Sequence, residues 1–512
     1  MSATDDNSLT FLRITDTTWE NVEMSLWFSM VIILAVTLFI LWRRKDDNYP
    51  PGPFNWPLIG NIQLNKAHLQ LTNLKNKYGD IYSVTISRKN IVVLCSLDSI
   101  LECLHYNGDA FANRPSCPVL RSLYKSGDKN EGFITADYDD KLEQKRDFLQ
   151  DCMVDGTYCL EYDTEMKIGS EVQDVLQKFI REKAPFNPFN LLYPSFLNVT
   201  LSIIFSQWHR NDEKDTNFQE ILKSLTLRAK CLKQTFPDIF PLPSFLENLR
   251  FKQIKERMRL QHEYQRKLIN FHKDTFNPCV LRDLTDQLLV YVENGDDKGL
   301  FASSDMENIL LEISGSGFES TAVCLTWLLG YMAMYPSIQS QVQEELDKVV
   351  GRENNPSLAE QPKLPYTLAT ICEAHRMASV MPFLYPHQAV KNTVLQGYDI
   401  PKDTWILCNV WSLHYDTRYW KNPKKFDPTR FLKDEKTISI PDCFLPFGIG
   451  VRECPGESLA TLNLFLYFTH ILHRMNIRPA DNKMPFHMEG ELEYLLLHKP
   501  KPFRIRAIRR NN

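Results

Sequence analysis

The stretch "FLPFGIGVRECPGESLA", residues Phe444–Ala460, places one cysteine between an arginine and a Pro-Gly pair, just before a leucine-rich run. Pro455 suits the first turn of a helix, so a helix is expected to begin beside Cys454. The free N–H groups and the dipole at a helix N-terminus stabilise an anion and therefore favour a thiolate. Cys454 has no neighbouring histidine and no paired cysteine in this stretch. The local sequence therefore favours neither nucleophilic catalysis nor zinc binding.

The residues around the cysteine indicate which group its thiolate could bind. Gly450 and Gly456 allow the backbone to come close to something large and flat, and Arg452 offers a cation two residues away. A thiolate, close-approach glycines and an arginine fit a haem iron whose propionates need neutralising. The alternative for a lone cysteine is a structural role.

The motif resembles that of a known family. Phe447, Gly450, Arg452, Cys454 and Gly456 match the haem-binding signature F-x-x-G-x-R-x-C-x-G of the cytochrome P450 family in order and spacing. The resemblance covers most of residues 50–512. It implies a mainly α fold with small β-sheets, the cytochrome P450 fold, preceded by a single N-terminal transmembrane helix. It also implies haem b as cofactor, with the Cys454 thiolate as axial ligand of the iron and Phe447 packed beside it.

A charge network is the second point of resemblance. Glu373 and Arg376 lie three residues apart and match the family's E-x-x-R pair, and Arg430 in "FDPTRF" matches the third member. Without the family, a pair with this spacing on a helix is usually an exposed ion pair of small energetic value. The resemblance implies that the three side chains hold the fold under the haem.

The resemblance also assigns contacts to the haem propionates. Arg452, His387 and Arg146 would meet them. The family usually has a tryptophan four residues before the arginine that aligns with Arg146, and this chain has Leu142 there. That propionate contact is expected to be lost.

The longest helical pattern runs over Asp305–Met334 and is predicted to be one helix. Successive residues of a helix turn by about 100°, so Ile313, Gly317, Ser320 and Cys324 share one face. The missing side chain of Gly317 would leave a notch, with a hydroxyl one turn further on. A helix–helix contact is the alternative explanation of this glycine.

Within this pattern "SGFEST" resembles the oxygen-binding helix motif of the family. The resemblance implies that Glu319 and Ser320 lie on the distal side of the haem. The usual threonine aligns with Ser320, and Thr321 follows it. We therefore take Ser320, Glu319 and Thr321 as the candidate catalytic residues, with Gly317 beside the haem.

The N-terminal part has its own organisation. Residues 24–42 are free of charge and long enough to cross a membrane, acidic residues precede them, and Arg43, Arg44 and Lys45 follow. We predict a lumenal tail (1–23), a transmembrane anchor (24–42), a basic and proline-rich connector (43–57) and a haem-thiolate monooxygenase domain (58–512). The alternatives for residues 24–42 are a buried core helix or a cleaved signal peptide. The anchor implies the microsomal type, a single-pass protein of the endoplasmic reticulum membrane with a cytoplasmic catalytic domain.

Composition bears on the partners of the protein and on its compartment. A net charge of −4 gives no reason to expect nucleic-acid binding, and the 12 cysteines include no CxxC pair, which favours a reducing compartment.

The apolar, proline-punctuated segment Phe236–Phe245 precedes a basic stretch. It is either a membrane contact near a substrate entrance or a packed loop beside a solvated helix.

The predicted function is monooxygenation of an apolar small molecule such as a steroid, lipid or xenobiotic. The resemblance implies electrons from NADPH through NADPH-cytochrome P-450 reductase, with cytochrome b5 as a further partner. Lys145 would either steer the acidic reductase or belong to a solvated face. "YPHQAV" and "NVWSLHYD" most resemble the animal microsomal branch that includes steroid 17-alpha-hydroxylases and xenobiotic-oxidising enzymes. The alternatives are a haem-thiolate isomerase that needs no reductase and a non-catalytic haem- or lipid-binding sensor, for which Leu142 is the one hint.

Overall fold

The computed structural model describes residues 25–37, 48–54, 66–86, 89–115, 133–154, 160–207, 215–232, 244–293, 303–434, 437–481, 488–493 and 497–510. The chain forms two compact units, one of residues 1–49 with Gly397–Asp399 and the other of Pro50–Gln396 with Ile400–Asn512. The predicted membrane-contacting segment Phe236–Phe245 lies outside the described residues except for its last two positions.

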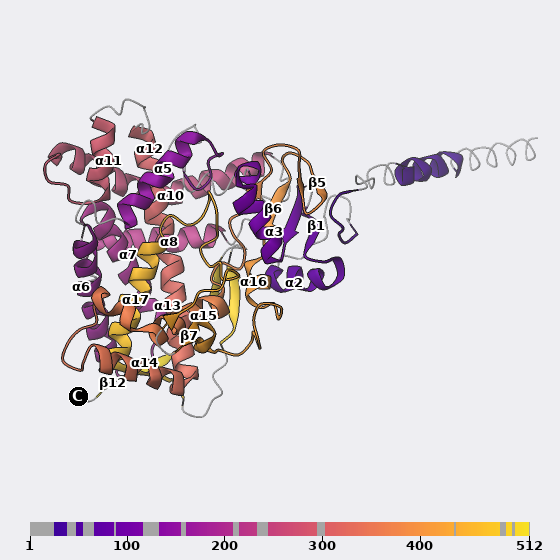
Figure 1. The fold of residues 1–512 in the computed structure, drawn as a ribbon. Helices are drawn as coiled ribbons and strands as arrows, with labels where there is room; N and C mark the ends of the chain where they lie inside the picture. The colour runs from indigo at the N-terminus through magenta and orange to yellow at the C-terminus, as the bar shows by residue number, and fades with distance from the viewer. Residues whose placement is uncertain are drawn as a thin grey trace, which may run out of the picture. The chain divides into compact units, whose positions relative to one another are not determined.

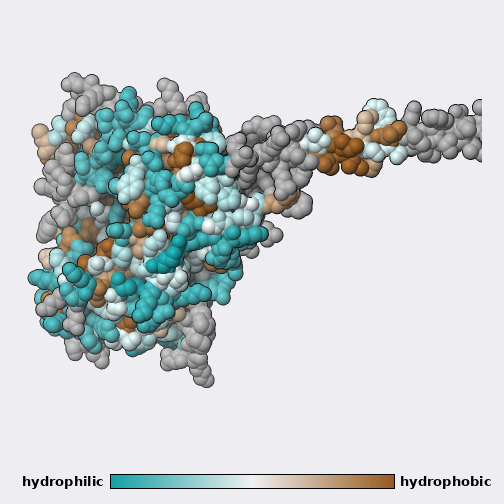
Figure 2. Space-filling model, turned by 45° about the vertical axis from the view of Figure 1, so that its right-hand side comes forward, coloured by the Kyte–Doolittle hydropathy of each residue, from teal (hydrophilic) through white to brown (hydrophobic). Residues whose placement is uncertain are grey.

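The first unit contains a short apolar helix, Ser25–Thr37. Its side chains are exposed and form the brown surface on the extended segment of Figure 2. Residues 38–47, where the predicted anchor would continue, lie outside the described part of the chain. Among the described residues no single helix has both the length and the apolar character needed to cross a membrane. The segments Asp305–Met334 and Pro336–Val349 have that length and apolar character only when taken together, and they are bent relative to each other.

The second unit is mainly helical (Figure 1). Its described α-helices are α2 (Ala67–Tyr78), α3 (Leu97–Leu101), α5 (Asp140–Val154), α6 (Leu160–Arg181), α7 (Phe189–Phe205), α8 (Thr216–Leu232), α10 (Ser244–Thr275), α11 (Leu284–Glu293), α12 (Ser303–Ser316), α13 (Glu319–Met334), α14 (Pro336–Val349), α15 (Pro365–Ala378), α16 (Val410–His414) and α17 (Glu457–Arg474). Short 3₁₀ or π turns are η1 (Glu102–Tyr106), η2 (Gly108–Phe111), η4 (Leu358–Lys363) and η5 (Pro428–Phe431).

The strands form small sheets. They are β1 (Ile81–Ile86), β2 (Lys89–Leu94), β3 (His387–Gln388), β4 (Thr393–Leu395), β5 (Tyr398–Ile400), β6 (Trp405–Cys408), β7 (Leu432–Asp434), β8 (Thr437–Ile438), β9 (Met475–Pro479), β10 (Gly490–Glu493), β11 (Leu497–Pro500) and β12 (Ile505–Arg509). The largest sheet has the order β1-β2-β6-β3. β1 and β2 pair antiparallel from Ile81↔Leu94 to Ile86↔Lys89. The predicted mainly α class with small sheets is therefore confirmed.

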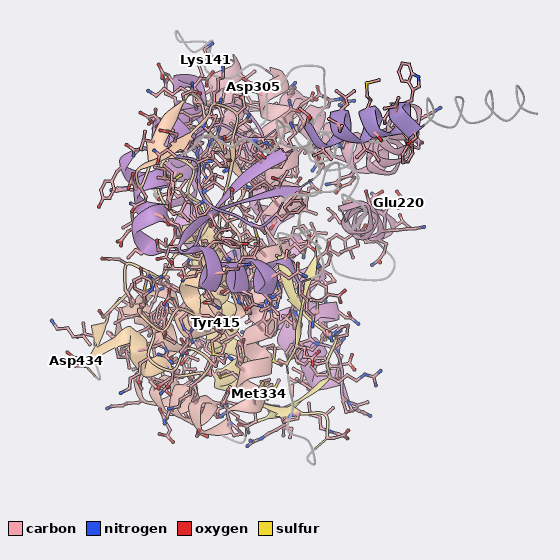
Figure 3. All side chains as sticks on the ribbon, turned by 90° about the vertical axis from the view of Figure 1, so that its right-hand side faces the viewer. Lys141, Glu220, Asp305, Met334, Tyr415 and Asp434 are labelled. Carbon is pink, nitrogen blue, oxygen red and sulfur yellow. The ribbon has the colours of Figure 1, made fainter. Side chains whose placement is uncertain are left out.

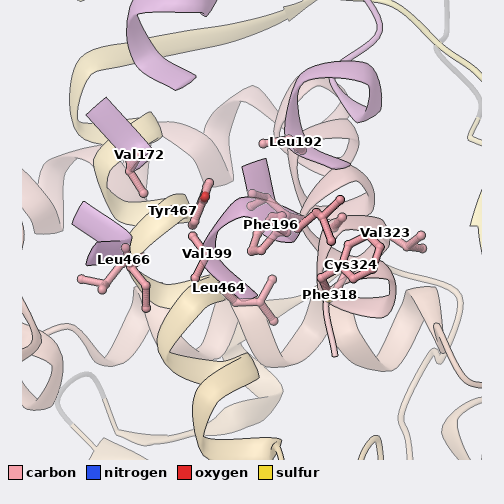
Figure 4. Close-up of a cluster of buried hydrophobic side chains, with 14 of the residues drawn as sticks. Val172, Leu192, Phe196, Val199, Phe318, Val323, Cys324, Leu464, Leu466 and Tyr467 are labelled. Carbon is pink, nitrogen blue, oxygen red and sulfur yellow. The ribbon is translucent and has the colours of Figure 1, made fainter. Parts of the chain in front are cut away.

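The core lies where α6, α7, α13 and α17 meet (Figure 4). Nearly every residue of α13 from Thr321 to Ala333 is buried, which is expected of a helix that is apolar all round. Phe196 of α7 stacks on Tyr467 of α17 with ring centroids 4.3 Å apart. This core supports the helix that carries the candidate catalytic residues.

The predicted single helix over Asp305–Met334 is wrong in one respect. It is broken at Gly317 and Phe318, so that α12 ends at Ser316 and α13 begins at Glu319. Phe318 has φ −121° and ψ −31°, outside the helical range, and so interrupts the ladder of hydrogen bonds. The two helices together still run along the body, since Asp305 and Met334 lie near its opposite ends in Figure 3.

Candidate functional site

The cysteine lies in a tight loop before α17. The N–H of Cys454 donates to the carbonyl of Phe447 at 2.9 Å, and the N–H of Glu453 donates to the carbonyl of Gly450 at 2.9 Å. Gly450 has φ +81°, and a Cβ on it would lie 1.9 Å from the carbonyl oxygen of Leu104. Only glycine fits this position, because both the left-handed backbone and the close approach exclude a side chain.

The start of α17 acts on the thiol as the sequence predicts, but burial outweighs it. Gly456 is the residue before the helix, and its backbone N–H lowers the pKa of the Cys454 thiol. Desolvation has the larger effect and raises that pKa above its ordinary value. The helix start therefore acts on the thiol in the predicted direction, and burial opposes it in the free thiol. A metal ion would shift the balance, because a coordinating thiol is deprotonated.

Cys454 opens into a cavity of about 760 Å³. Every predicted site residue except Gly450 lines it: Gly317, Glu319, Ser320 and Thr321 around the start of α13, Arg146 and His387, and Phe447, Arg452, Cys454 and Gly456 of the cysteine loop. Apolar side chains complete the wall, among them Leu104, Ile134, Ile313, Val380, Leu384 and Leu497. The structure thus brings residues about 310 positions apart in the sequence to one apolar chamber.

Three buried arginines converge on this cavity: Arg114, Arg146 and Arg452. Burial lowers the pKa of each, and Arg452 and Arg146 lower that of Arg114 further by repulsion. For Arg452 the pKa falls to about 10. The buried Nε of Arg114 has no hydrogen-bond partner. Such a concentration of uncompensated positive charge suits a ligand that carries more than one negative charge.

Backbone carbonyls hold these guanidinium groups in place. Arg452 donates to the carbonyls of Ala112 at 2.8 Å, Phe133 at 3.2 Å and Ala136 at 2.7 Å. Its guanidinium also lies over the ring of Tyr138, 5.5 Å from the centroid. The cation therefore has a fixed position without any carboxylate among these contacts.

The other two arginines are held in the same way. Arg146, on α5, donates to the carbonyls of Val451 at 3.1 Å and of Glu453, so it also clamps the cysteine loop. Arg114 donates to the carbonyls of Tyr385 at 2.9 Å and Pro386 at 3.0 Å. All three side chains therefore reach the cavity with their charge intact.

His387 and Leu142 are the two remaining positions that bear on the predicted propionate contacts. The Nδ1 of His387 lies 3.0 Å from the carbonyl oxygen of Phe111, and burial holds the pKa of the imidazole well below its usual range. Because a carbonyl oxygen only accepts, Nδ1 carries the proton, so the neutral ring can accept one hydrogen bond at Nε2 near pH 7. A propionate beside Nε2 would favour the protonated ring, which donates from both nitrogens. Leu142 is buried and apolar, so it offers no hydrogen bond.

The break between α12 and α13 shapes the opposite wall. A Cβ at Gly317 would lie 2.9 Å from the carbonyl oxygen of Ile313, so the position has no room for a side chain. Because α13 starts afresh at Glu319, its first N–H groups have no partner within the helix. Glu319, Ser320 and Thr321 all occupy this first turn. The carboxylate of Glu319 pairs with Lys499 of β11 at 2.6 Å.

Comparison with known proteins decides the family. The cytochrome P450 family model matches residues 50–507. The chain belongs to the cytochrome P450 family. Among its relatives are cytochrome P450 2U1 of Bos taurus (31% identical, covering 93% of this chain and 92% of the relative) and cytochrome P450 2D3 of Rattus norvegicus (30%, 94% and 97%). Cytochrome P450 2J2 of Homo sapiens is 32% identical over 88% of this chain and 91% of the relative.

Membership settles the general chemistry and the fold. The chain has the cytochrome P450 fold, is in general terms a haem-thiolate monooxygenase, and binds haem with a cysteine thiolate as axial ligand. The arginine cluster fits the propionates of that cofactor, and Gly456 lines the cavity beside Cys454. Gly450, which was expected to approach the cofactor as well, instead lies against the backbone of Leu104.

The charge network of this cytochrome P450 is formed as the resemblance implies. Glu373 accepts from Arg376 at 2.7 and 2.9 Å and from Arg430 at 3.1 Å. Arg376 also donates to the carbonyl of His414 at 2.7 Å. The network is buried on α15 and ties it to the segment before η5, so its role is structural.

Sequence reasoning missed two residues of the site, Arg114 and Lys499. Arg114 comes 271 residues before the carbonyl of Tyr385 that holds it, and Lys499 comes 180 residues after Glu319. Neither stands in a motif that suggested a partner. Lys145 differs from the expectation as well, because it is 13% exposed and pairs with Asp305 at 2.6 Å. It is therefore not a freely exposed cation.

Proposed function

We propose that this cytochrome P450 inserts one oxygen atom from dioxygen into an apolar small molecule such as a steroid, lipid or xenobiotic. One observation carries the proposal: the cysteine loop and the hydroxyl-bearing first turn of α13 face the same largely apolar cavity. A largely apolar cavity with a small number of placed polar groups is what binding of such substrates requires.

Cys454 is the proposed axial ligand, and Phe447 packs beside it. Arg114, Arg146, Arg452 and His387 would hold the propionates of haem b. When bound, the haem supplies the reductive activation of dioxygen that no side chain can provide. The residues of the chain bind and orient the substrate, exclude water and deliver protons.

Proton delivery is assigned to the first turn of α13. Activation of dioxygen consumes protons, and a hydroxyl that holds a water can relay them. Ser320 provides that hydroxyl on the cavity wall, Glu319 is the neighbouring titratable group, and Thr321 is the second hydroxyl of the turn. The aligned threonine of the family is replaced by serine here, which keeps the hydroxyl and loses a methyl group.

The proposed partners are NADPH-cytochrome P-450 reductase and cytochrome b5. Because Lys145 is paired with Asp305, exposed cations elsewhere must meet an acidic partner. Lys141, exposed on the same helix and labelled in Figure 3, is one candidate. Exposed charges of this kind raise the rate of encounter more than the affinity.

The proposed location is the endoplasmic reticulum membrane, with a single N-terminal span and a cytoplasmic catalytic domain. The support comes from the uncharged run at residues 24–42 and the basic residues that follow it. The apolar, exposed helix Ser25–Thr37 lies within that run. The proposed domain bounds remain 1–23, 24–42, 43–57 and 58–512.

A screen of steroids, fatty acids and drugs tests the function. A substrate that enters the cavity should shift the spin state of the haem band, and the same compound should stimulate NADPH consumption in the presence of the reductase. Product carrying one added oxygen atom is the expected result. Substrates that shift the band without stimulating NADPH consumption would contradict the proposal.

A further inference from the structure

The β10–β11 hairpin carries a cation to the edge of the cavity. Leu497 of β11 lines the cavity wall, and its neighbour His498 is fixed by its backbone. The N–H of His498 donates to the carbonyl of Val380 at 2.8 Å, and its carbonyl accepts from the indole N–H of Trp327 at 3.0 Å. These bonds join the hairpin to α13 and to the segment after α15. The position of the next residue, Lys499, is therefore set by the fold.

Lys499 meets Glu319 at that point. Its Nζ lies 2.6 Å from Oε1 of Glu319, and both side chains are only 15% exposed. The same Nζ lies 5.2 Å from the centroid of the Phe189 ring. Three elements, α7, α13 and β11, thus enclose one ion pair at the wall that carries Ser320.

A second ion pair, near the end of β11, can be compared with the pair of Lys499 and Glu319. Lys501, two residues further on, pairs with Glu489, but these side chains are 56% and 68% exposed. Water screens an exposed pair of this kind, so its loss changes little. A pair shielded on most sides is different, because removing one partner leaves the other charge without compensation.

The location of the pair suggests its function. Glu319 is the first residue of α13 and directly precedes Ser320, and both residues line the cavity. A carboxylate that was free to rotate could turn toward solvent and lose the water between it and the hydroxyl. Lys499 removes this freedom by occupying one carboxylate oxygen, which leaves Oε2 to hold water.

We propose that Lys499 is a positioning residue for proton delivery in this cytochrome P450: it holds the Glu319 carboxylate where it can order water against Ser320. The inference rests on the proposed function and adds to it a residue from a distant strand. The proton travels along that water from solvent to the hydroxyl, and the carboxylate regains its original state after each transfer. Lys499 itself exchanges no proton with the reacting atoms.

The test compares full-length variants reconstituted with reductase and a substrate that shifts the haem band. Lys499→Met should lower the fraction of NADPH converted into product by about fivefold or more and raise hydrogen peroxide. This is a small part of the roughly 10²–10⁴-fold that a positioned proton-transfer group contributes, because Glu319 itself remains. Lys499→Arg should restore coupling, because it keeps the charge. Lys501→Met is the matched control and should leave coupling, haem content and substrate affinity unchanged.

A double-mutant cycle separates positioning from a general structural role. Glu319→Gln should uncouple the enzyme, and adding Lys499→Met should cost little more, because the lysine acts through the carboxylate. The solvent isotope effect on product formation should rise in Lys499→Met and should have the wild-type value in Lys499→Arg. In chemical denaturation, which needs no turnover, the two substitutions should be non-additive by about twofold or more in the unfolding equilibrium constant.

The possible failures are distinct. If Lys499→Met and Lys501→Met uncouple equally, or if the two substitutions at Glu319 and Lys499 are additive in both assays, the positioning role is wrong. If Glu319→Gln leaves coupling intact, Lys499 cannot act through it, and the inference falls while the monooxygenase proposal stands. If wild-type protein consumes no NADPH with substrate, the proposed function fails. The denaturation cycle would then still decide whether the pair couples, and an additive result would overturn the inference.

Discussion

The Glu373 carboxylate accepts two hydrogen bonds from the Arg376 guanidinium, at 2.7 and 2.9 Å, and both side chains are completely buried. The carboxylate also accepts from Arg430 at 3.1 Å and from the backbone N–H of Asp427 at 2.9 Å. The rings of Trp420 and Tyr415 lie 5.1 and 5.7 Å from the Arg376 guanidinium. This cluster ties α15 to the segment before η5, so its integrity should decide whether the cysteine loop folds.

Replacing Glu373 by alanine should therefore prevent accumulation of folded, haem-loaded protein. Removing one partner of a buried ion pair costs about 3–5 kcal/mol, because the remaining charge is left without compensation. Haem content per polypeptide and thermal unfolding measure the effect. Glu353→Ala, at an exposed position, is the control. A Glu373→Ala protein with normal haem content and unchanged unfolding temperature would refute the structural role.

Cys454→Ser should abolish thiolate ligation. The reduced, carbon monoxide-bound wild type should show the red-shifted Soret band of a thiolate-ligated haem, and the variant should lack it, because a serine hydroxyl is not a thiolate. Cys279→Ser, at an exposed cysteine, should keep the band. Survival of the band in Cys454→Ser would assign the ligand to another residue.

Gly450→Ala should interfere with formation of the cysteine loop. The substitution adds a Cβ 1.9 Å from the Leu104 carbonyl oxygen at a φ of +81°. The left-handed backbone alone costs about 1–2 kcal/mol for a residue with a Cβ, and the clash adds to it. Gly397→Ala is a matched control, since Gly397 has the same φ of +81° but nothing within 4 Å of its Cβ position. Haem incorporation should fall strongly in the first variant and stay close to wild type in the second.

A buried carboxyl group predicts how stability depends on pH. Glu171 of α6 is completely buried, accepts from Asn198 at 2.7 Å, and burial raises its pKa from 4.5 to about 7. The folded state then binds the proton more tightly than the unfolded state. Its contribution to stability is fully present below pH 4.5 and is lost as pH rises through 7. The loss amounts to roughly 3 kcal/mol at most, by 1.36 kcal/mol for each pH unit.

Glu171→Gln should remove this dependence, because the amide can still accept from Asn198 and carries no charge. The free energy of unfolding, measured between pH 5 and pH 8, should fall less steeply in the variant, which should be the more stable protein at pH 8. Glu182→Gln, at an exposed position, should follow the wild type. Parallel curves for Glu171→Gln and wild type would show that the carboxyl group does not carry the effect.

The parts of the structure that depend on residues close together in the sequence could be predicted from the sequence. The cysteine motif combines Gly450, which has a positive φ, with a helix that begins at Glu457. The strands β1 and β2 are rich in β-branched residues and close together in the sequence. The spacing of three residues indicates that Glu373 and Arg376 can pair on a helix, and the family resemblance supplied the expectation that the network holds the fold.

The missed features depend on packing between distant segments. Gly317 marks a weak point in the long helix, but the break also needs Phe318, whose ring packs edge-on against Tyr193 of α7 with centroids 5.0 Å apart. Arg114 and Lys499 gain their roles only when the fold brings them to Tyr385 and Glu319. The pKa of Cys454 likewise depends on burial, which exceeds the local effect of the helix start.

The last prediction concerns the two hydroxyls of α13. Ser320 and Thr321 both line the cavity, and they follow each other in one helix, so their side chains point about 100° apart. The two hydroxyls therefore meet the cavity from different directions, and we predict that Ser320, one turn beyond Gly317, holds the water that relays protons. Ser320→Ala should let NADPH oxidation continue while product falls and hydrogen peroxide rises, because protons no longer reach the cavity in step with electrons. Thr321→Ala should show this much less. The comparison needs a substrate that binds both variants equally, checked by the spin-state shift. Uncoupling by Thr321→Ala alone would place the relay on the neighbouring residue, and coupling preserved in both variants would place the proton path elsewhere.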